Sequence, residues 1–226
     1  MIPFLIMNQH DKEIYLKRYN ERLELYGDSP ETLGWGKNAR QELRFQVLSD
    51  LATQNKFSSI LDVGCGFADL YGFLKNKNWQ GQYLGIDINK NLLNIALQKY
   101  PQVSVKQQDI LQEELNQSYD YVIASGIFNA KLEKENNYTY IEAMLRTMYS
   151  IAKEAVCVDF LSTYVDYMQE IAWHSNPEEI IKIAHTISKR FNVRYDYMPY
   201  EFSLILYKNQ TISNINTFEG FNLKHS

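Results

Sequence analysis

The sequence predicts an α/β protein with a doubly wound, mostly parallel seven-stranded sheet, a terminal antiparallel hairpin and an N-terminal helical arm. Between residues 58 and 161, short β-branched runs alternate with amphipathic helical patterns, which is the rhythm of a parallel sheet covered on both faces. The last two strand-like runs, 193–197 and 202–207, are separated by only residues 198–201. This spacer is too short for a helical crossover, so these two strands must be antiparallel.

The individual elements follow from local patterns. A charged and aromatic helix is expected over residues 11–26, closed by Gly27, and a second helix carries Leu43, Val47 and Leu51 at helical spacing. The parallel strands are expected at residues 58–63, 82–88, 103–106, 119–124 and 155–161. Helices are expected at residues 68–78 and 89–100, around the apolar stripe 141–152, and from residue 176 onward, whereas 162–175 has the period of neither structure.

These patterns divide the chain into three parts. Residues 1–54 form a helical arm that could act as a lid, 55–209 form the core, and 210–226 form a polar tail. A chain of 226 residues suits one domain with a sizeable hydrophobic core. We expect a cytoplasmic protein without a membrane segment, because no stretch approaches the roughly 20 apolar residues that a membrane helix needs.

The composition of the chain excludes some classes of partner and site. The net charge of −4 and the pI near 5.6 disfavour a nucleic-acid partner. Cys65 and Cys157 are the only cysteines and lie in unrelated local settings, so a disulfide is not expected. We expect no metal site, because the sequence has no Cys/His cluster. Nothing in the sequence indicates an oligomeric state.

The turn after the first strand carries the strongest functional signal. Gly64 and Gly66 stand where a buried strand must turn into a helix, which is the nucleotide-binding corner of a doubly wound fold. A nicotinamide site would show G-x-G-x-x-G, but here Asp69 replaces the third glycine. Asp62 precedes the turn, and Asp87 ends the second strand, where its carboxylate can accept both hydroxyls of a ribose. This corner therefore favours a phosphate-free nucleoside, and its acids suit a cationic cofactor.

In kind and order, these residues resemble the class I S-adenosylmethionine-dependent methyltransferases, over about residues 33–208. The resemblance implies S-adenosyl-L-methionine as cofactor and S-adenosyl-L-homocysteine as product. The family often has a third glycine where this chain has Ala68, which we expect to be tolerated while the backbone stays helical. Motif positions matched to the family are the acid-x-Gly-x-Gly turn, an acid for the ribose, an acid for the adenine amine and the end of the fourth strand beside the methyl group: Asp62, Gly64, Cys65, Gly66, Asp87, Ile88, Asp109, Ile110, Ser125 and Gly126.

Two residues of the arm are further cofactor-binding candidates. Trp35 lies between two glycines, and with Arg44 it could cover the ligand pocket opposite the glycine turn. A packing role, with Trp35 anchoring the arm to the sheet, is the alternative.

Methyl transfer depends mostly on alignment, and a general base is needed only when the acceptor is an alcohol or a protonated amine. His174 is the candidate base, because it lies in the segment after the fifth strand, which should border the methyl group. The alternative for His174 is a surface or capping role before Asn176 and Pro177.

The acceptor is less well defined. After the fourth strand the chain reads Ser-Gly-Ile-Phe-Asn at residues 125–129, not the Asn-Pro-Pro-aromatic motif of related nucleic-acid and glutamine methyltransferases. The arm and residues 162–175 are the chain available for a lid, which favours an enclosed pocket and methylation of an O or N atom of a small molecule. A protein methyltransferase, a non-catalytic cofactor-binding partner and a nicotinamide oxidoreductase stay as alternatives.

Overall fold

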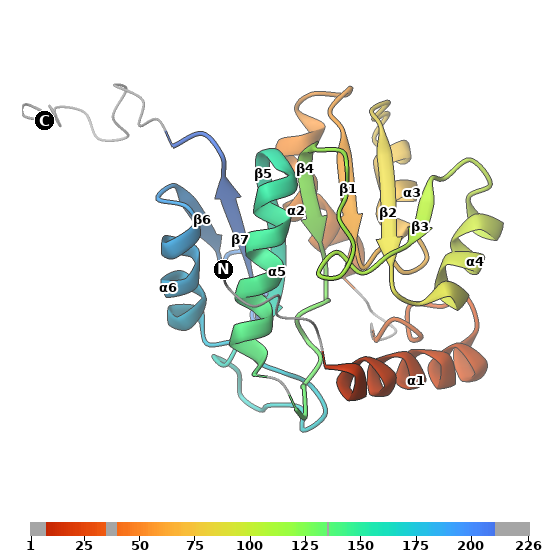
Figure 1. Ribbon diagram of the computed structural model, residues 1–226, viewed down its shortest axis with the longest axis horizontal. Coiled ribbons are helices and arrows are strands. Elements are labelled where there is room, and N and C mark those ends of the chain that lie inside the picture. The colour runs from red at the N-terminus through yellow and green to blue at the C-terminus, as the bar shows by residue number, and fades with distance from the viewer. Residues whose placement is uncertain (1–7, 35–39, 135, 211–226) are drawn as a thin grey trace, which may run out of the picture.

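The computed structural model describes residues 8–34, 40–134 and 136–210. A seven-stranded sheet runs through it in the order β3-β2-β1-β4-β5-β7-β6, as Figure 1 shows. The strands are β1 (Ile60–Val63), β2 (Tyr83–Asp87), β3 (Val105–Gln107), β4 (Tyr119–Ala124), β5 (Ala152–Leu161), β6 (Phe191–Arg194) and β7 (Glu201–Tyr207). The helices are α1 (Gln9–Tyr26), α2 (Gln41–Thr53), α3 (Asp69–Asn76), α4 (Lys90–Lys99), α5 (Asn137–Ile151) and α6 (Pro177–Ile187).

The order in which the strands pair predicts where a ligand binds. β1 lies between β2 and β4 and pairs in parallel with both, so the strand order reverses at this point. In doubly wound sheets, ligands bind outside the carboxyl ends of the strands at such a switch point. At the far edge, β7 pairs antiparallel with both β5 and β6. The predicted doubly wound sheet with a terminal hairpin is confirmed.

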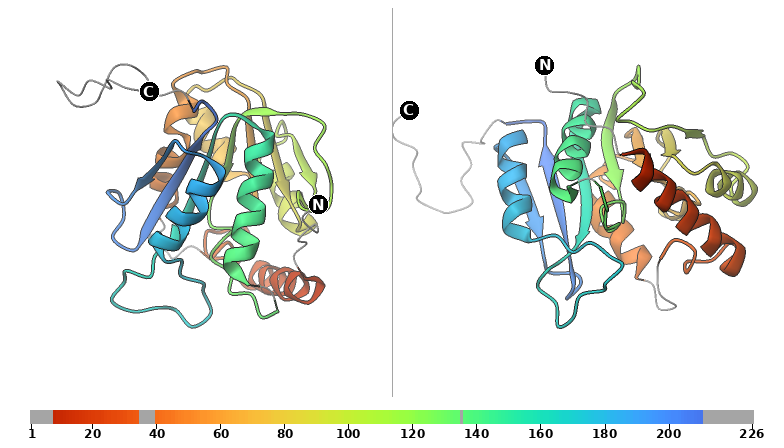
Figure 2. Two further views of the ribbon diagram at one scale, coloured as in Figure 1. Left: turned by 60° about the vertical axis from the view of Figure 1, so that its left-hand side comes forward. Right: turned by 60° about the horizontal axis from the view of Figure 1, so that its bottom comes forward.

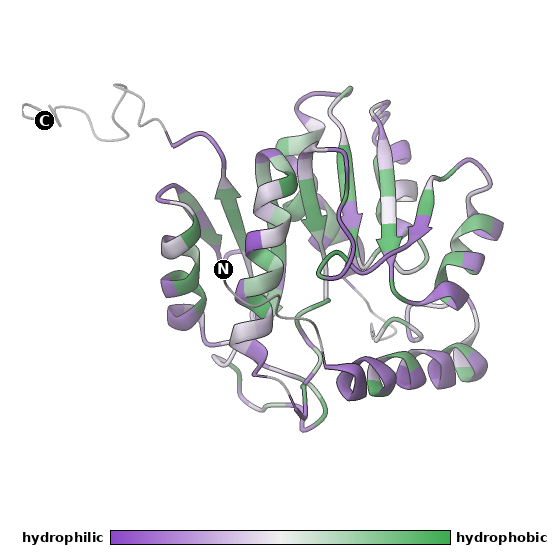
Figure 3. Ribbon diagram, in the orientation of Figure 1, coloured by the Kyte–Doolittle hydropathy of each residue, from purple (hydrophilic) through white to green (hydrophobic). Residues whose placement is uncertain are grey.

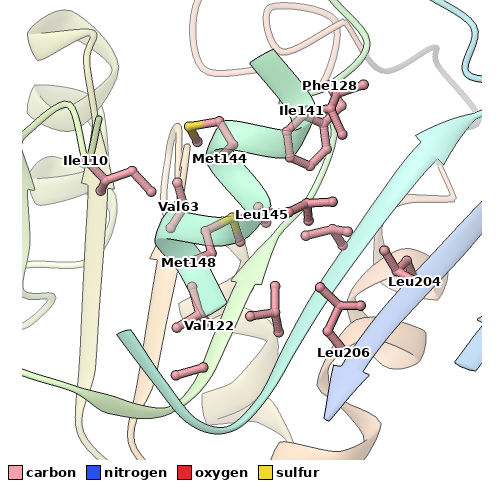
Figure 4. Close-up of a cluster of buried hydrophobic side chains, with 14 of the residues drawn as sticks. Val63, Ile110, Val122, Phe128, Ile141, Met144, Leu145, Met148, Leu204 and Leu206 are labelled. Atoms are coloured by element: carbon pink, nitrogen blue, oxygen red, sulfur yellow. The ribbon is translucent and has the colours of Figure 1, made fainter. Parts of the chain in front are cut away.

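Two hydrophobic layers hold the helices on the sheet. α5 and α6 cover one face, and Figure 2 shows them side by side. Met144, Leu145 and Met148 of α5 belong there to one buried cluster with Val122 of β4 and Leu204 of β7 (Figure 4). α2, α3 and α4 cover the other face, around Leu48, Leu74 and Ala96. Both layers bury the apolar stripes expected from helical spacing.

Several boundaries differ from the sequence-based expectation. β5 begins at Ala152, directly where α5 ends, because the backbone of Ala152 is already extended and no loop separates the two elements. β3 is displaced to Val105–Gln107, where it pairs with the last residues of β2. Local apolarity does not determine where a strand begins or ends; pairing with its neighbour does.

The two helices of the arm behave differently. α2 buries Phe45, Leu48 and Ala52 against the sheet, so it contributes to the hydrophobic core although the expected boundary at residue 54 assigns it to the arm. α1 crosses the carboxyl ends of the strands in Figure 1 and is mostly hydrophilic in Figure 3. Asp11 is its only buried residue. Within the described ranges, no helix is long and apolar enough to cross a membrane.

Candidate functional site

The glycine turn after β1 requires residues without a Cβ. Gly64 and Gly66 have φ of +72° and +52°, which glycine adopts without strain. A Cβ on Gly64 would lie 2.3 Å from Cγ2 of Ile127, and one on Gly66 would lie 3.1 Å from a methyl carbon of Leu33. Ala68 was expected to stay helical, but its φ of +58° is left-handed. This expectation is wrong: α3 begins after Ala68, and the turn extends to it.

Asp87 organises the turn from the end of β2. Its Oδ2 accepts the backbone N–H of Gly66 at 3.0 Å, and its Oδ1 accepts that of Asn89 at 2.8 Å. Asp87 is buried, and burial raises the pKa of its carboxyl, while these backbone hydrogen bonds oppose that rise. Each oxygen keeps a further lone pair for a ligand hydroxyl.

Asp62, on β1, is a second buried acid. It accepts the hydroxyl of Tyr83 at 2.6 Å. Burial raises the pKa of Asp62 to about 7, the Tyr83 hydrogen bond opposes this, and the charges of Asp87 and Asp69 reinforce it. Two carboxyls that resist ionisation together in one pocket create a strong preference for a nearby positive charge.

Asp109 lies beyond β3, at the other end of the same crevice. Its Oδ1 accepts the backbone N–H of Leu111 at 3.1 Å, and its Oδ2 pairs with Lys12 of α1 at 3.0 Å. Ile88 and Ile110 border the small cavity next to it. The structure therefore brings together the residues predicted to bind the ribose and the adenine. Lys12 of the arm forms an ion pair with Asp109, the acid predicted to bind the adenine amine.

The space between these residues is narrow. Two cavities of about 50 Å³ each lie here, and both are bordered by Tyr15, Gly64, Asp87 and Ile127. Cys65 and Ser125 border the first. A nucleoside-sized ligand needs a pocket of roughly 300 Å³ or more. The chemical groups fit S-adenosyl-L-methionine, but with the Tyr15 side chain in its present position the two cavities are smaller than this cofactor.

Polar contacts hold α1 in this place. Asp11 accepts the backbone N–H groups of Glu133 and Lys134, at 2.8 Å and 3.2 Å. At the other end, Asn20 accepts the side-chain amides of Asn89 and Asn91. These hydrogen bonds tie the two ends of α1 to the loops that follow β4 and β2.

Asp159 is a residue of the site that the sequence did not predict. This buried residue of β5 accepts the Ser125 hydroxyl at 2.5 Å and the Gly126 backbone N–H at 2.7 Å, and so fixes the loop after β4. Burial raises its pKa to about 6, and the charge of Glu201 adds to this. A carboxylate inside the otherwise apolar run 155–161 was the available signal.

A larger cavity of about 770 Å³ lies next to the first small cavity. Gly126 borders both this cavity and the first small one, and Tyr19 and Leu33 do so as well. Segments from α1, α2, the loop after β4, residues 161–172 and residues 198–201 surround it. It is the space next to the end of β4, where the methyl group is expected.

Arg44 borders the larger cavity and neither of the two small cavities. It is buried and pairs with Glu201 of β7, with its Nε 2.6 Å from the Glu201 carboxylate. The structure therefore does not bring Arg44 to the glycine turn. Trp35 lies outside the described residues.

The ring of His174 forms hydrogen bonds with the backbone of its own loop. Its Nδ1 lies 2.7 Å from the carbonyl oxygen of Ser162, and its Nε2 accepts the backbone N–H of Gln169 at 3.2 Å. Both ring nitrogens thus hold the backbone of the loop 162–175, and His174 borders none of the three cavities. This geometry argues against the predicted role as a base.

No group of three or more His, Cys, Asp or Glu residues suited to a metal ion lies in the described part of the chain.

Comparisons with known proteins agree with this geometry. Residues 54–193 match a family model described as a methyltransferase domain. The chain is 26% identical over 155 residues to the Mycobacterium tuberculosis protein named "Putative methyltransferase Rv1506c", covering 66% of this chain and 93% of that one. Magnesium protoporphyrin IX methyltransferase from Synechocystis, with bound SAH, has a TM-score of 0.64 at 19% identity, covering 88% and 100% of the two chains. Its SAM-bound structure has a TM-score of 0.63 at 22% identity, covering 88% and 97%.

Proposed function

The chain belongs to the methyltransferase-domain family and is a class I S-adenosyl-L-methionine-dependent methyltransferase, and we propose that its acceptor is an O or N atom of a small molecule. The cavity of about 770 Å³ next to the end of β4 carries this proposal. Its volume lies in the range of small-molecule sites. It is walled by α1 and the loop 162–175, the two segments expected to form a lid.

When bound, S-adenosyl-L-methionine supplies a methyl group on a positively charged sulfur. In our proposal, Asp87 binds the ribose hydroxyls, and Asp109, which also pairs with Lys12, binds the adenine amine. Asp62 lies behind the glycine turn, where the positive sulfur of a bound cofactor would favour its ionised form over the protonated form that burial favours. Asp159 acts through Ser125 and Gly126: it positions the loop after β4, which lies between the two small cavities and the larger one.

The loop after β4 supports a small molecule over a nucleic acid. The side-chain oxygen of Asn129 accepts the backbone N–H of Leu161 at 3.0 Å, and its carbonyl accepts that of Trp173 at 3.0 Å. These bonds tie the loop to β5 and to the segment 162–175. Asn129 therefore forms part of the cavity wall, in place of an Asn-Pro-Pro-aromatic platform for a flipped base.

The test is methyl transfer from labelled S-adenosyl-L-methionine to two fractions of a cell extract, one of low molecular mass and one of protein. Label in the low-mass fraction is the expected result. Label confined to protein would favour a protein methyltransferase. Tight donor binding without label in either fraction would favour a non-catalytic partner. The variant Asp87→Ala is the control for transfer that depends on the donor site.

A further inference from the structure

The charged residues around the larger cavity are almost all arginines. Arg18 and Arg22 come from α1, Arg40 precedes α2, and Arg44 lies within it. Among the described residues, the only acid bordering the cavity is Glu201, which pairs with Arg44. Within the described part of the chain, the other three arginines have no carboxylate partner, so the cavity carries an uncompensated positive charge.

Two of these guanidinium groups are held in place without being neutralised. Arg18 and Arg22 are four residues apart and so lie on the same face of α1. Nη1 of Arg18 donates to the carbonyl of Ile171 at 3.4 Å. Nε of Arg22 donates to the carbonyls of Glu31 and Thr32, at 3.0 Å and 3.1 Å. Carbonyls orient a guanidinium but leave its charge, and each group has five N–H donors.

The charge of the bordering side chains changes sign between the two small cavities and the larger cavity. Acids border the two small cavities: Asp62, Asp69, Asp87 and Asp109. Arginines border the larger one. A cationic donor is favoured on one side of Gly126, and an anion is favoured on the other. Because Arg is suited to bidentate recognition of carboxylates and phosphates, the arginine side indicates an oxyanion.

The rest of the cavity wall is largely apolar. Leu33, Leu161, Ile171, Met198 and Tyr200 contribute to it. Such a site fits a molecule with an apolar body and an anionic head. We propose that the methyl acceptor is a small organic acid of this kind, whose carboxylate or phosphate is bound by Arg18, Arg22 and Arg40. This inference rests on the small-molecule acceptor proposed above.

The experiment measures binding to the full chain saturated with S-adenosyl-L-homocysteine. This product fills the donor site, so its own carboxylate is already accommodated. Three probes that share a naphthyl body are compared by calorimetry: 2-naphthoate, 2-naphthyl phosphate and the neutral 2-naphthamide. Wild type, Arg18→Gln and Arg40→Gln are measured. Arg146→Gln is the control, because Arg146 pairs with Glu142 on the surface of α5 and borders none of the three cavities.

We expect wild type to bind at least one anionic probe about tenfold more tightly than the amide. The better anion identifies the head group as carboxylate or phosphate. Arg18→Gln and Arg40→Gln should each remove most of this preference and leave amide binding unchanged, whereas Arg146→Gln should keep it.

Equal binding of all three probes by wild type, or their common failure to bind, would overturn the proposal without any variant. A preference that survives in both cavity variants would overturn it as well. The affinity for S-adenosyl-L-homocysteine is measured separately for each protein. If it is intact while the anion preference is absent, the acceptor class is wrong and the methyltransferase assignment stands.

Discussion

The ionisation of Asp62 can be tested directly by Asp62→Asn. In the wild-type protein, burial raises the pKa of this carboxyl to about 7, compared with a value near 3.9 in an unfolded chain. The folded state therefore favours the protonated acid. The stability that this preference contributes is fully present below about pH 4 and is lost as the pH rises through about 7.

The magnitude follows from the two pKa values. A difference of about 3 corresponds to about 4 kcal/mol, at about 1.4 kcal/mol for each tenfold change in the proton equilibrium. Between pH 5 and pH 8, about 2.5 kcal/mol of this is expressed. The asparagine side chain of the variant does not titrate, and its amide oxygen can still accept the Tyr83 hydroxyl. Between these pH values, the free energy of unfolding of the variant relative to wild type should therefore rise by about 2.5 kcal/mol.

Urea unfolding of the apo protein at pH 5, 6, 7 and 8 measures this difference, and subtraction cancels the titration of other groups. Tyr83→Phe is the companion variant, with the opposite expectation. It removes the hydrogen bond that lowers the pKa of Asp62, so stability should fall more steeply above pH 7 than in wild type. A pH-independent difference for Asp62→Asn would refute the reasoning, because it would mean that Asp62 ionises at its ordinary pKa.

Three further outcomes are expected. Asp87→Ala should weaken S-adenosyl-L-methionine binding at least tenfold, about 1.4 kcal/mol for lost ribose hydrogen bonds; unchanged affinity in calorimetry would remove Asp87 from the site. Asp11→Ala should free one end of α1 from the loop at residues 133–134, so hydrogen exchange in α1 should accelerate while exchange in α5 stays unchanged; equal protection in α1 would show that other contacts hold it. His174→Ala should make the loop 162–175 more sensitive to proteolysis, because both ring nitrogens hold its backbone; a lower rate of methyl transfer with undiminished resistance to protease would restore the role as a base.

The donor side of the site could be predicted from the sequence because its signals are local. Gly64 and Gly66 stand where a strand becomes a helix, Asp87 is the last residue of β2, and Asp109 follows the end of β3. In a parallel sheet, the carboxyl ends of strands lie at one edge, so residues in these positions must converge whatever the details of packing. The terminal hairpin was equally determined, by the length of its connection.

The larger cavity, where we propose that the acceptor binds, was decided only by tertiary structure. Arg18 and Arg40 are far from residues 161–172 in the chain, and no local pattern places them around one cavity. The partner of Arg44 is Glu201, 157 residues away. His174 was a reasonable base by position, but the fold directs its nitrogens to the backbone. The sequence by itself therefore determined a donor site built from strand ends. Only the packing of α1 and the long loops against the sheet decided which residues surround the larger cavity, because long-range contacts carry no periodicity along the chain.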